Sequence, residues 1–392
     1  MKILQVTPFF SPVHGGSAEV PYQLSRELAK KEHQITIYTS DYKLSSKYIS
    51  SIPEIEVHSF KTWLGVASFY ITPGMISTIR QEIKHLDVIH MHNYRTFQNI
   101  VARHYARKYG IPYVLQAHGS ATTFFQKGML KRIFDKVWGY RILRDATKLI
   151  ALTPTEAEQY KSMGISEDKI EIVPNGIDLA EFENLPQRGQ FRKKYGLDDA
   201  QKVVLYLARI HKIKGPDLLA KAFAELSKDL GDAKLIIAGP DDGYLAALKE
   251  LIRELKIEEK VMFTGPLYGR DKLGAYVDAD VYVLPSAYET FPVSVLEACA
   301  CGTPVIVTDR CGIANVLDGQ AGLVVTYDKN QLQDALQRVL SDDQMRQKFR
   351  NGAKSLVREK SNWSKIAEQV EAIYEKCVSS KPSKSPGMPV PW

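Results

Sequence analysis

Two glutamates eight positions apart, Glu289 and Glu297, form the carboxylate pair with the clearest capacity for chemistry in this sequence. They follow the apolar run 281–284, which predicts a buried strand, and Glu297 falls within an apolar segment that predicts a helix. Pro292 suits the first turn of that helix, because its missing N–H costs nothing there. We expect Glu289 in the loop at the carboxyl end of the strand and Glu297 more than one turn into the helix. Carboxylates so placed can contact the hydroxyls of a sugar or a ribose, while the first-turn amides bind an anion or a hydroxyl.

A basic segment follows another predicted strand, 203–207, and contains Arg209 and Lys214. Two fixed positive charges at such a place would stabilise a leaving diphosphate without a metal ion. A solvated basic loop is the alternative, and the carboxylate pair elsewhere in the same half makes it the weaker reading.

The first half of the chain offers two further candidates. Gly15 and Gly16 lie between the first predicted strand and a helix that starts near Ser17. Glycines there let backbone amides approach a pyrophosphate, although a simple turn is the alternative and the three-glycine dinucleotide fingerprint is absent. His118 follows the predicted strand 112–116, so we expect it at the carboxyl end of that strand, facing the ligand, rather than in a purely structural role.

The elements that must position these residues follow a repeated βαβ rhythm. Predicted strands are 3–7, 34–38, 88–90, 112–116 and 148–152 in the first half, and 203–207, 234–237, 260–263, 281–284, 304–307 and 322–325 in the second. Predicted helices include 18–31, 99–109, 218–230 and 244–255. The polar, proline- and glycine-containing stretch 174–189 predicts a linker.

This pattern predicts an α/β protein with two Rossmann-like, doubly wound domains that face a central cleft. Residues 1–175 form the first domain, which the amphipathic helix 363–377 completes, and residues 190–360 form the second. The Lys-, Pro- and Ser-rich tail 379–392 is expected to be disordered. Open sheets bind ligands at the carboxyl ends of their strands, so the chemistry should come from the loops there.

Composition sets broad limits on the class of protein. The 392 residues include 44% hydrophobic and 25% charged residues, which is ordinary for a globular protein, and the net charge is +7. No RNA-binding signature is present, so we expect no nucleic-acid partner. Neither a signal peptide nor an apolar stretch of ~18 residues is visible, and the four cysteines fit no disulfide framework. These features predict a cytoplasmic protein with reduced thiols.

Two short motifs imitate metal sites. Asp278-Ala279-Asp280 immediately precedes the strand 281–284, at its amino end, so a structural role is expected rather than metal binding. His90 and His92 could lie on one strand face, but no third ligand is evident, which favours packing or acceptor contact. We therefore expect no metal.

Two amphipathic or apolar segments of the first half could touch a membrane. Segment 123–148 mixes basic residues with Phe, Met, Leu, Ile and Trp, which suits either an interfacial helix or a buried helix with a basic outer face. Segment 63–75 is apolar and ends beside Pro73-Gly74. If both border the cleft, the acceptor could be a lipid-linked glycan at the inner face of an anionic membrane.

These features together resemble glycosyltransferase family 4, the retaining enzymes with the GT-B fold. The resemblance covers nearly the whole chain and runs from Gly15-Gly16 through Ala117-His118-Gly119 and Val173–Asp178 to the basic pair and the Glu-x7-Glu motif. It implies a hexosyltransferase that takes a UDP- or GDP-sugar and needs no metal or other cofactor. The acceptor would be a glycan or lipid-linked molecule in cell-surface polysaccharide or glycolipid synthesis.

The resemblance also implies roles for single residues. Arg209 and Lys214 would hold the donor diphosphate, Glu289 the transferred sugar and Glu297 the nucleotide ribose. The remaining residues would lie around the donor: backbone groups of Thr290 and Phe291 at the sugar hydroxyls, Gly16 with Gly15 at the phosphates, and His118 near the reacting carbon. Helix 363–377 is similar to the helix that crosses back to the first domain in this family.

One position departs from the family pattern, because many relatives have glycine where this chain has Pro292. Proline has no N–H to donate, which puts a sugar contact from that amide in doubt. A sugar-nucleotide epimerase of the same fold and a non-enzymatic, basic membrane- or RNA-binding protein are the alternatives. The combination of Arg209, Lys214 and the two glutamates disfavours both, while the identity of the sugar and of the acceptor stays open.

Overall fold

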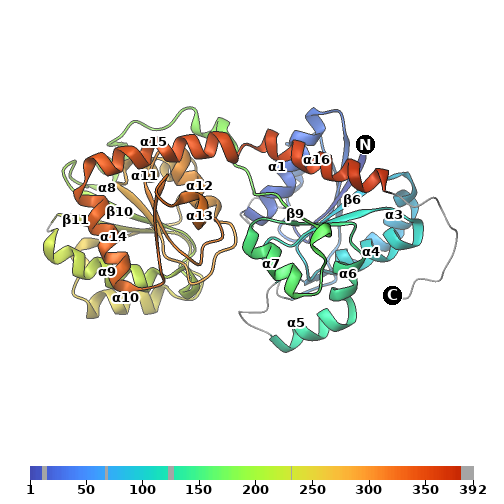
Figure 1. Ribbon diagram of the computed structural model, residues 1–392, viewed down its shortest axis with the longest axis horizontal. Coiled ribbons are helices and arrows are strands. Elements are labelled where there is room, and N and C mark those ends of the chain that lie inside the picture. Colours follow the sequence, from blue (N-terminus) through green and yellow to red (C-terminus); the bar gives the residue numbers. More distant parts are fainter. Residues whose placement is uncertain (11–15, 67–68, 122–127, 231, 381–392) are drawn as a thin grey trace. The chain divides into compact units, whose positions relative to one another are not determined.

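The structure, a computed structural model, describes residues 1–10, 16–66, 69–121, 128–230 and 232–380. The chain divides into two compact units (Figure 1). Unit 1 comprises Met1–Gly176 and the C-terminal segment that starts at Trp363, and unit 2 comprises Ile177–Asn362. The first part of the stretch predicted as a linker, up to Gly176, thus belongs to unit 1 and the remainder to unit 2.

The described part of unit 1 contains a seven-stranded sheet in the order β3-β2-β1-β6-β7-β8-β9, and all of its neighbouring strands are parallel. The strands are β1 (Lys2–Val6), β2 (Gln34–Ser40), β3 (Glu56–Phe60), β6 (Val88–His92), β7 (Tyr113–Gln116), β8 (Lys148–Ala151) and β9 (Ile170–Ile172). A separate antiparallel hairpin pairs β4 (Leu64–Val66) with β5 (Phe69–Ile71). The central strands β6 and β7 are fully buried, and β1 is buried after its first residue, Lys2, as expected when helices cover both faces.

The helices of unit 1 are α1 (Gly16–Lys30), α2 (Ser46–Ser50), α3 (Gly74–Glu82), α4 (Phe97–Tyr109), α5 (Gly128–Phe134), α6 (Tyr140–Asp145), α7 (Pro154–Ser162) and α16 (Trp363–Ser379), with the short turns η2 (Ile83–His85) and η4 (Glu167–Lys169). A π-helical turn, η3 (Asp135–Gly139), joins α5 to α6. The C-terminal helix α16 lies against α1 (Figure 1), and its apolar face shares a core with β1. The predicted amphipathic helix 363–377 therefore packs on the first half of the chain.

Unit 2 contains, within its described residues, a six-stranded parallel sheet in the order β12-β11-β10-β13-β14-β15. The strands are β10 (Lys202–Leu207), β11 (Ala233–Ala238), β12 (Val261–Gly265), β13 (Val281–Leu284), β14 (Val305–Thr308) and β15 (Gly322–Val325). The helices are α8 (Gln190–Tyr195), α9 (Pro216–Asp229), α10 (Leu245–Glu254), α11 (Gly269–Asp278), α12 (Val293–Ala300), α13 (Ala314–Leu317), α14 (Lys329–Ser341) and α15 (Asp343–Lys360), with the turns η5 (Leu179–Phe182), η6 (Lys212–Lys214) and η7 (Glu258–Lys260).

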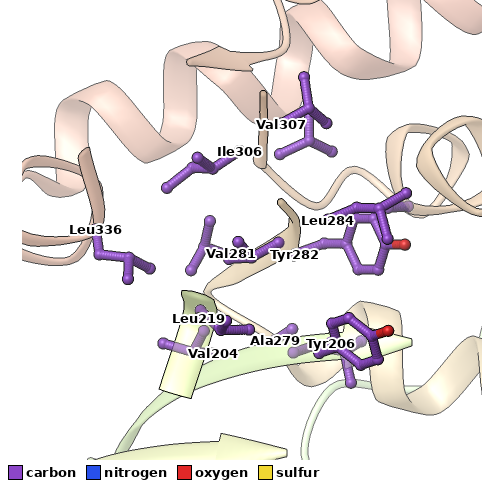
Figure 2. Packing of buried hydrophobic residues seen from close by; sticks show 14 of the residues in the cluster. Val204, Tyr206, Leu219, Ala279, Val281, Tyr282, Leu284, Ile306, Val307 and Leu336 are labelled. Carbon is purple, nitrogen blue, oxygen red and sulfur yellow. The ribbon is translucent and has the colours of Figure 1, made fainter. Parts of the chain in front are cut away.

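The core of unit 2 fixes the strand ends that matter for the site. Figure 2 shows side chains of β10, β13 and β14 packed together, with Leu219 of α9 and Leu336 of α14 beside them. Tyr206 and Tyr282 are fully buried, and their hydroxyls donate to the carbonyls of Arg209 (2.9 Å) and Leu207 (3.1 Å). Because buried hydroxyls need partners, these bonds hold the loop that follows β10.

The two parallel α/β units agree with the sequence prediction, and so do the strands predicted for unit 2. One local expectation was wrong by one position. Pro292 has an extended backbone (ψ 107°) and caps α12 from outside, so the helix begins at Val293. All four cysteines are free and buried. In the described segments, no helix combines the length and the apolar character needed to cross a bilayer.

Candidate active site

The structure brings Lys214 and Glu289 together in unit 2. Lys214 ends the turn η6 after β10, and Glu289 lies in the loop after β13, the neighbouring strand. Their side chains form an ion pair, with only 16% and 14% of the side chains exposed. A half-buried charge pair of this kind is screened less by water than a surface pair. The carboxyl ends of β10 and β13 thus carry a fixed cation and a fixed carboxylate at one place, as the sequence predicts.

Backbone contacts fix the relative positions of the two segments that carry this pair. The amide of Ala287 donates to the carbonyl of Ile213 (2.8 Å), which joins the loop after β13 to η6. Gly215 follows η6 with a φ of +69°, and a Cβ at this position would lie 2.0 Å from the carbonyl oxygen of Pro285. Only glycine permits both that dihedral and that approach.

Glu289 is also fixed from its other side. Its amide donates to the carbonyl of Arg310 (3.1 Å), and its carbonyl accepts from the amide of Gly312 (2.8 Å), so the loop after β13 runs parallel to the loop after β14. The position of the carboxylate therefore depends on three consecutive strands of the sheet, β10, β13 and β14.

Glu297 lies on α12 and uses both carboxylate oxygens within unit 2. Oε1 accepts from Nζ of Lys272 (2.8 Å), and Oε2 accepts from the hydroxyl of Tyr276 (3.0 Å). Burial alone would lower the pKa of Lys272, but the charge of Glu297 and its hydrogen bond outweigh burial, so the pKa of Lys272 is raised above its usual value. Both carboxylate oxygens of Glu297 are thus held in place by partners on α11. The sequence reading missed its two partners, which lie four positions apart on α11 and could have been sought by that spacing.

Thr290 and Phe291 occupy the half-buried loop between Glu289 and the cap residue Pro292. The hydroxyl of Thr290 donates to the hydroxyl of Tyr288 (3.2 Å). The amides that open α12 belong to Val293 and Ser294, because proline has none, and first-turn amides lack acceptors inside a helix. These amides lie directly after the loop and can bind hydroxyl or anionic groups.

Arg209 takes a different place from Lys214. It forms an ion pair with Asp242, and 60% of its side chain is exposed. The structure therefore does not bring Arg209 into contact with Glu289, although both basic residues follow β10. An exposed pair of this kind contributes little to stability, so a stronger anionic partner can displace Asp242 at small cost.

In unit 1, His118 belongs to a network of imidazoles. Its Nε2 lies 2.9 Å from Nδ1 of His92, and the two rings stack at 5.2 Å. His92 contacts Oε1 of Gln5 through Nε2 (2.6 Å), and Tyr374 of α16 contacts Gln5 (3.3 Å) and His90 (2.6 Å). The two histidines of the His-Met-His motif therefore pack around the candidate residue and α16, as the packing interpretation predicted.

This network assigns the proton on His118. Gln5 donates through its amide nitrogen to Tyr374, so its oxygen must accept from Nε2–H of His92. Nδ1 of His92 then accepts from Nε2–H of His118, which leaves Nδ1 of His118 with a lone pair. That atom is buried and has no hydrogen-bond partner among the described residues. Burial lowers the pKa of His118 to about 3, so the ring is neutral at pH 7 and can accept a hydrogen bond but is a weak base.

The backbone of His118 is unusual, with a φ of +52°, a region that few non-glycine residues adopt. The buried Glu156 on α7 holds the loop by accepting from the amides of Gly119 and Leu152, both at 2.7 Å. Thr153 caps α7 three positions before Glu156, the spacing of a capping box. The sequence reading missed Glu156, which that spacing could have indicated.

The remaining candidates divide between the two glycines and the apparent metal motif. Gly16 begins α1, and Gly15 lies outside the described residues. Asp278 accepts from the amides of Gly189 and Arg192, and Asp280 pairs with Arg192, so both aspartates have the structural role that we expected. Within the described ranges, no group of three or more His, Cys, Asp or Glu side chains gathers as a metal site would require.

Comparison with known proteins places both units in one class of enzyme. Residues 14–181 match the family described as Glycosyltransferase Family 4, and residues 187–356 match Glycosyl transferases group 1. The chain is 30% identical to the uncharacterized glycosyltransferase MJ1607 of Methanocaldococcus jannaschii, over 96% of this chain and 98% of that protein. It is 31% identical to D-inositol 3-phosphate glycosyltransferase of Nocardia farcinica, over 78% of this chain and 70% of the relative.

Solved structures share the fold along nearly the whole chain. HepE of Anabaena, crystallised with UDP and glucose, has a TM-score of 0.79 at 18% identity and covers 96% of this chain and 100% of its own. Sucrose-phosphate synthase of Thermosynechococcus elongatus has a TM-score of 0.76 at 22% identity, with 97% and 100% covered. Both support the GT-B fold that the sequence predicted.

Proposed function

Because the chain belongs to glycosyltransferase family 4, we propose that it transfers a hexose from a UDP- or GDP-sugar, with retention of anomeric configuration and without a metal ion. The observation that carries this proposal is the Lys214–Glu289 pair at the adjoining carboxyl ends of β10 and β13. A nucleotide-sugar needs a cation at its diphosphate and a carboxylate at its sugar hydroxyls, and this pair supplies both.

Each part of the donor has a partner in unit 2 under this proposal. Lys214 neutralises the diphosphate, and Arg209 joins it by exchanging Asp242 for a phosphate. Glu297, held by Lys272 and Tyr276, accepts hydrogen bonds from the ribose. The amides that follow Pro292, with Thr290 and Phe291, bind sugar hydroxyls.

In unit 1, we assign His118 to a sugar hydroxyl, which would donate to the free lone pair on Nδ1. A ring with a pKa of about 3 does not remove the acceptor's proton efficiently at pH 7. If the acceptor attacks the sugar from the same face that the diphosphate leaves, the departing phosphate oxygen would take that proton instead. Gly15 and Gly16 would contact the phosphates.

For the acceptor, we propose a glycan or lipid-linked molecule at a cytoplasmic membrane surface, in polysaccharide or glycolipid synthesis. Large apolar side chains are exposed in both segments that the sequence singled out: Trp63 (74%), Leu64 (59%), Met129 (77%), Leu130 (65%) and Ile133 (53%). On α5 they accompany Lys131 and Arg132, a combination suited to an anionic surface. Co-sedimentation with anionic liposomes at low salt tests this part, and an unbound protein would contradict it.

A phosphorylated cyclic polyol is the second candidate acceptor, because several relatives that are 27–31% identical carry the name D-inositol 3-phosphate glycosyltransferase. An acceptor panel distinguishes the two candidates. Membrane extract and inositol phosphates are incubated separately with each donor, and the labelled product is identified by mass.

The test of the function uses a panel of UDP- and GDP-linked sugars with a ¹³C-labelled hexose. We expect one nucleotide series to raise the melting temperature, since a ligand that binds only the folded state stabilises it. We also expect the label in a glycoside whose anomeric configuration matches that of the donor, with the rate unchanged by EDTA. Conversion of the donor into an epimeric sugar nucleotide would contradict the proposal and support the epimerase alternative.

A further inference from the structure

A polar pocket lies in unit 2, and neither Lys214 nor Glu289 is among its lining residues. It has a volume of about 280 Å³, close to the lower limit of ~300 Å³ for small-molecule pockets. Its walls include Lys202, the first residue of β10, and Asp280, which directly precedes β13. The pocket therefore lies at the amino ends of the same strands whose carboxyl ends carry the candidate active site. The six residues of β10 span five steps of about 3.3 Å, which separates the two ends of the strand by about 17 Å.

The pocket has an excess of positive charge. Five cationic side chains line it, and they face three carboxylates. The cations are Arg188, Arg192, Lys202, Arg346 and Arg350, and the carboxylates belong to Asp199, Asp280 and Asp343. The lining therefore carries a net charge of plus two, which an occupant of opposite charge would neutralise.

Two of the arginines in the lining are occupied by structural contacts. Arg192, only 2% exposed, donates to the carbonyls of Asp198 and Gln201 and pairs with Asp280. Arg346, 5% exposed, donates to the carbonyls of Val339 and Leu340 near the end of α14 and pairs with Asp343. Arg192 thus ties α8 to the segments that precede β10 and β13, and Arg346 ties α15 to α14, which explains why these two charges are buried.

The other three cations are not neutralised in this way. Arg350 has no ion pair in the part of the chain that the structure describes, and its Nε is buried without a hydrogen-bond partner. Lys202 is 3.7 Å from Asp343, a carboxylate that is itself 83% exposed, and Arg188 shares Asp280 with Arg192. Burial lowers the pKa of Arg350 and of Lys202, and neighbouring arginines lower it further. Lys202 and Arg188 thus share their carboxylates with Arg346 and Arg192, and Arg350 has none, so the pocket keeps more cations than its carboxylates neutralise.

We propose that this pocket is a second anion site of the protein, in which Arg188, Lys202 and Arg350 bind a phosphate or diphosphate group of a small molecule. Guanidinium groups match the geometry of phosphate oxygens and form short, charge-assisted hydrogen bonds with them. An anion between these residues joins the segment before β10 to α15 and relieves the repulsion among the cations. The site is independent of the proposed sugar transfer.

Calorimetric titration of the full chain with inorganic phosphate and with pyrophosphate tests the proposal, at constant ionic strength in chloride. The Lys214→Ala variant serves as the background, because it weakens diphosphate binding at the other site. We expect Arg350→Gln and Lys202→Gln each to weaken binding about tenfold or more, the loss of one charge-assisted hydrogen bond. Lys348 is an exposed cation on α15, the helix of Arg350, but lies outside the pocket, so Lys348→Gln should leave binding unchanged.

The comparison of the two anions shows whether the site takes one phosphoryl group or two. Equal binding in Arg350→Gln, Lys202→Gln and the background variant would overturn the proposal. The absence of heat with both anions at about 10 mM would also overturn it, because ordinary metabolite sites are occupied at lower concentrations. Neither substitution removes a buried contact to a carboxylate, and the melting temperature of each variant verifies that it is folded.

Discussion

Replacing Lys214 with alanine removes the cation that pairs with Glu289 and leaves that carboxylate, 14% exposed, without its partner. Breaking a fully buried pair costs about 3–5 kcal/mol and breaking an exposed one at most about 1 kcal/mol, so a half-buried pair should cost about 1–3 kcal/mol of folding stability. Because a small domain has about 5–15 kcal/mol of stability, the variant should remain folded.

The effect on catalysis should be larger than the effect on stability. A charge that stabilises the leaving diphosphate acts mainly in the transition state, and loss of one such group reduces turnover about 100-fold or more. We expect the same reduction for Glu289→Ala. Turnover is measured as release of nucleoside diphosphate at saturating donor, and stability as the midpoint of urea unfolding.

Lys212 provides a matched control, because it belongs to the same turn η6 but is exposed and has no ion pair among the described residues. Lys212→Ala should keep wild-type turnover. If folded Lys214→Ala turns over within about threefold of wild type, then it has lost less than 1 kcal/mol of transition-state stabilisation and the assigned role is wrong.

The remaining predictions concern the ribose carboxylate, the glycine after η6 and His118. Glu297→Gln should raise the KM for the donor about tenfold with little change in kcat, because ribose contacts exist in both ground and transition states; steady-state kinetics at varied donor check this. Gly215→Ala should lower the free energy of unfolding by about 2 kcal/mol or more, because the alanine Cβ would meet the carbonyl of Pro285 and φ is +69°. Urea unfolding measures this loss, and an unchanged midpoint would contradict the close approach of Gly215 to Pro285. The pKa of His118 is lowered from 6.5 to about 3, so unfolding takes up a proton between these values and stability is lost as the pH falls through this range. His118→Asn should therefore show a flatter dependence of unfolding free energy on pH than wild type, and equal slopes would contradict a buried neutral ring.

The sequence predicted the central strands of both sheets but missed β3 and β9 of unit 1. These are the two edge strands of that sheet, and each has only one neighbour. All of their residues except Phe60 are accordingly half-exposed or exposed, and the sequences of Glu56–Phe60 and Ile170–Ile172 lack the continuous apolar run of a buried parallel strand. A criterion based on buried apolar runs cannot find strands of this kind.

For the site, the sequence located the loops but not the partners of each side chain. Arg209 and Lys214 follow the same strand, yet one meets Asp242 and the other Glu289. Gly215, which follows Lys214, lies close to Pro285 after β13, a contact between neighbouring strands of the sheet that the local sequence does not reveal. Lys272 and Glu297 lie on different helices, α11 and α12, and only their packing brings the charges together.

Calorimetric titration of the full chain with UDP and with GDP, in the presence of EDTA, tests the central claim most directly. We predict that one of the two nucleotides binds to the wild type and to Lys212→Ala with equal affinity, and about tenfold or more weakly to Lys214→Ala, as expected for the loss of a charge-assisted contact. Binding that requires a divalent metal, that is unaffected by Lys214→Ala, or that is absent with both nucleotides would contradict a metal-independent nucleotide-sugar site built on Lys214 and Glu289.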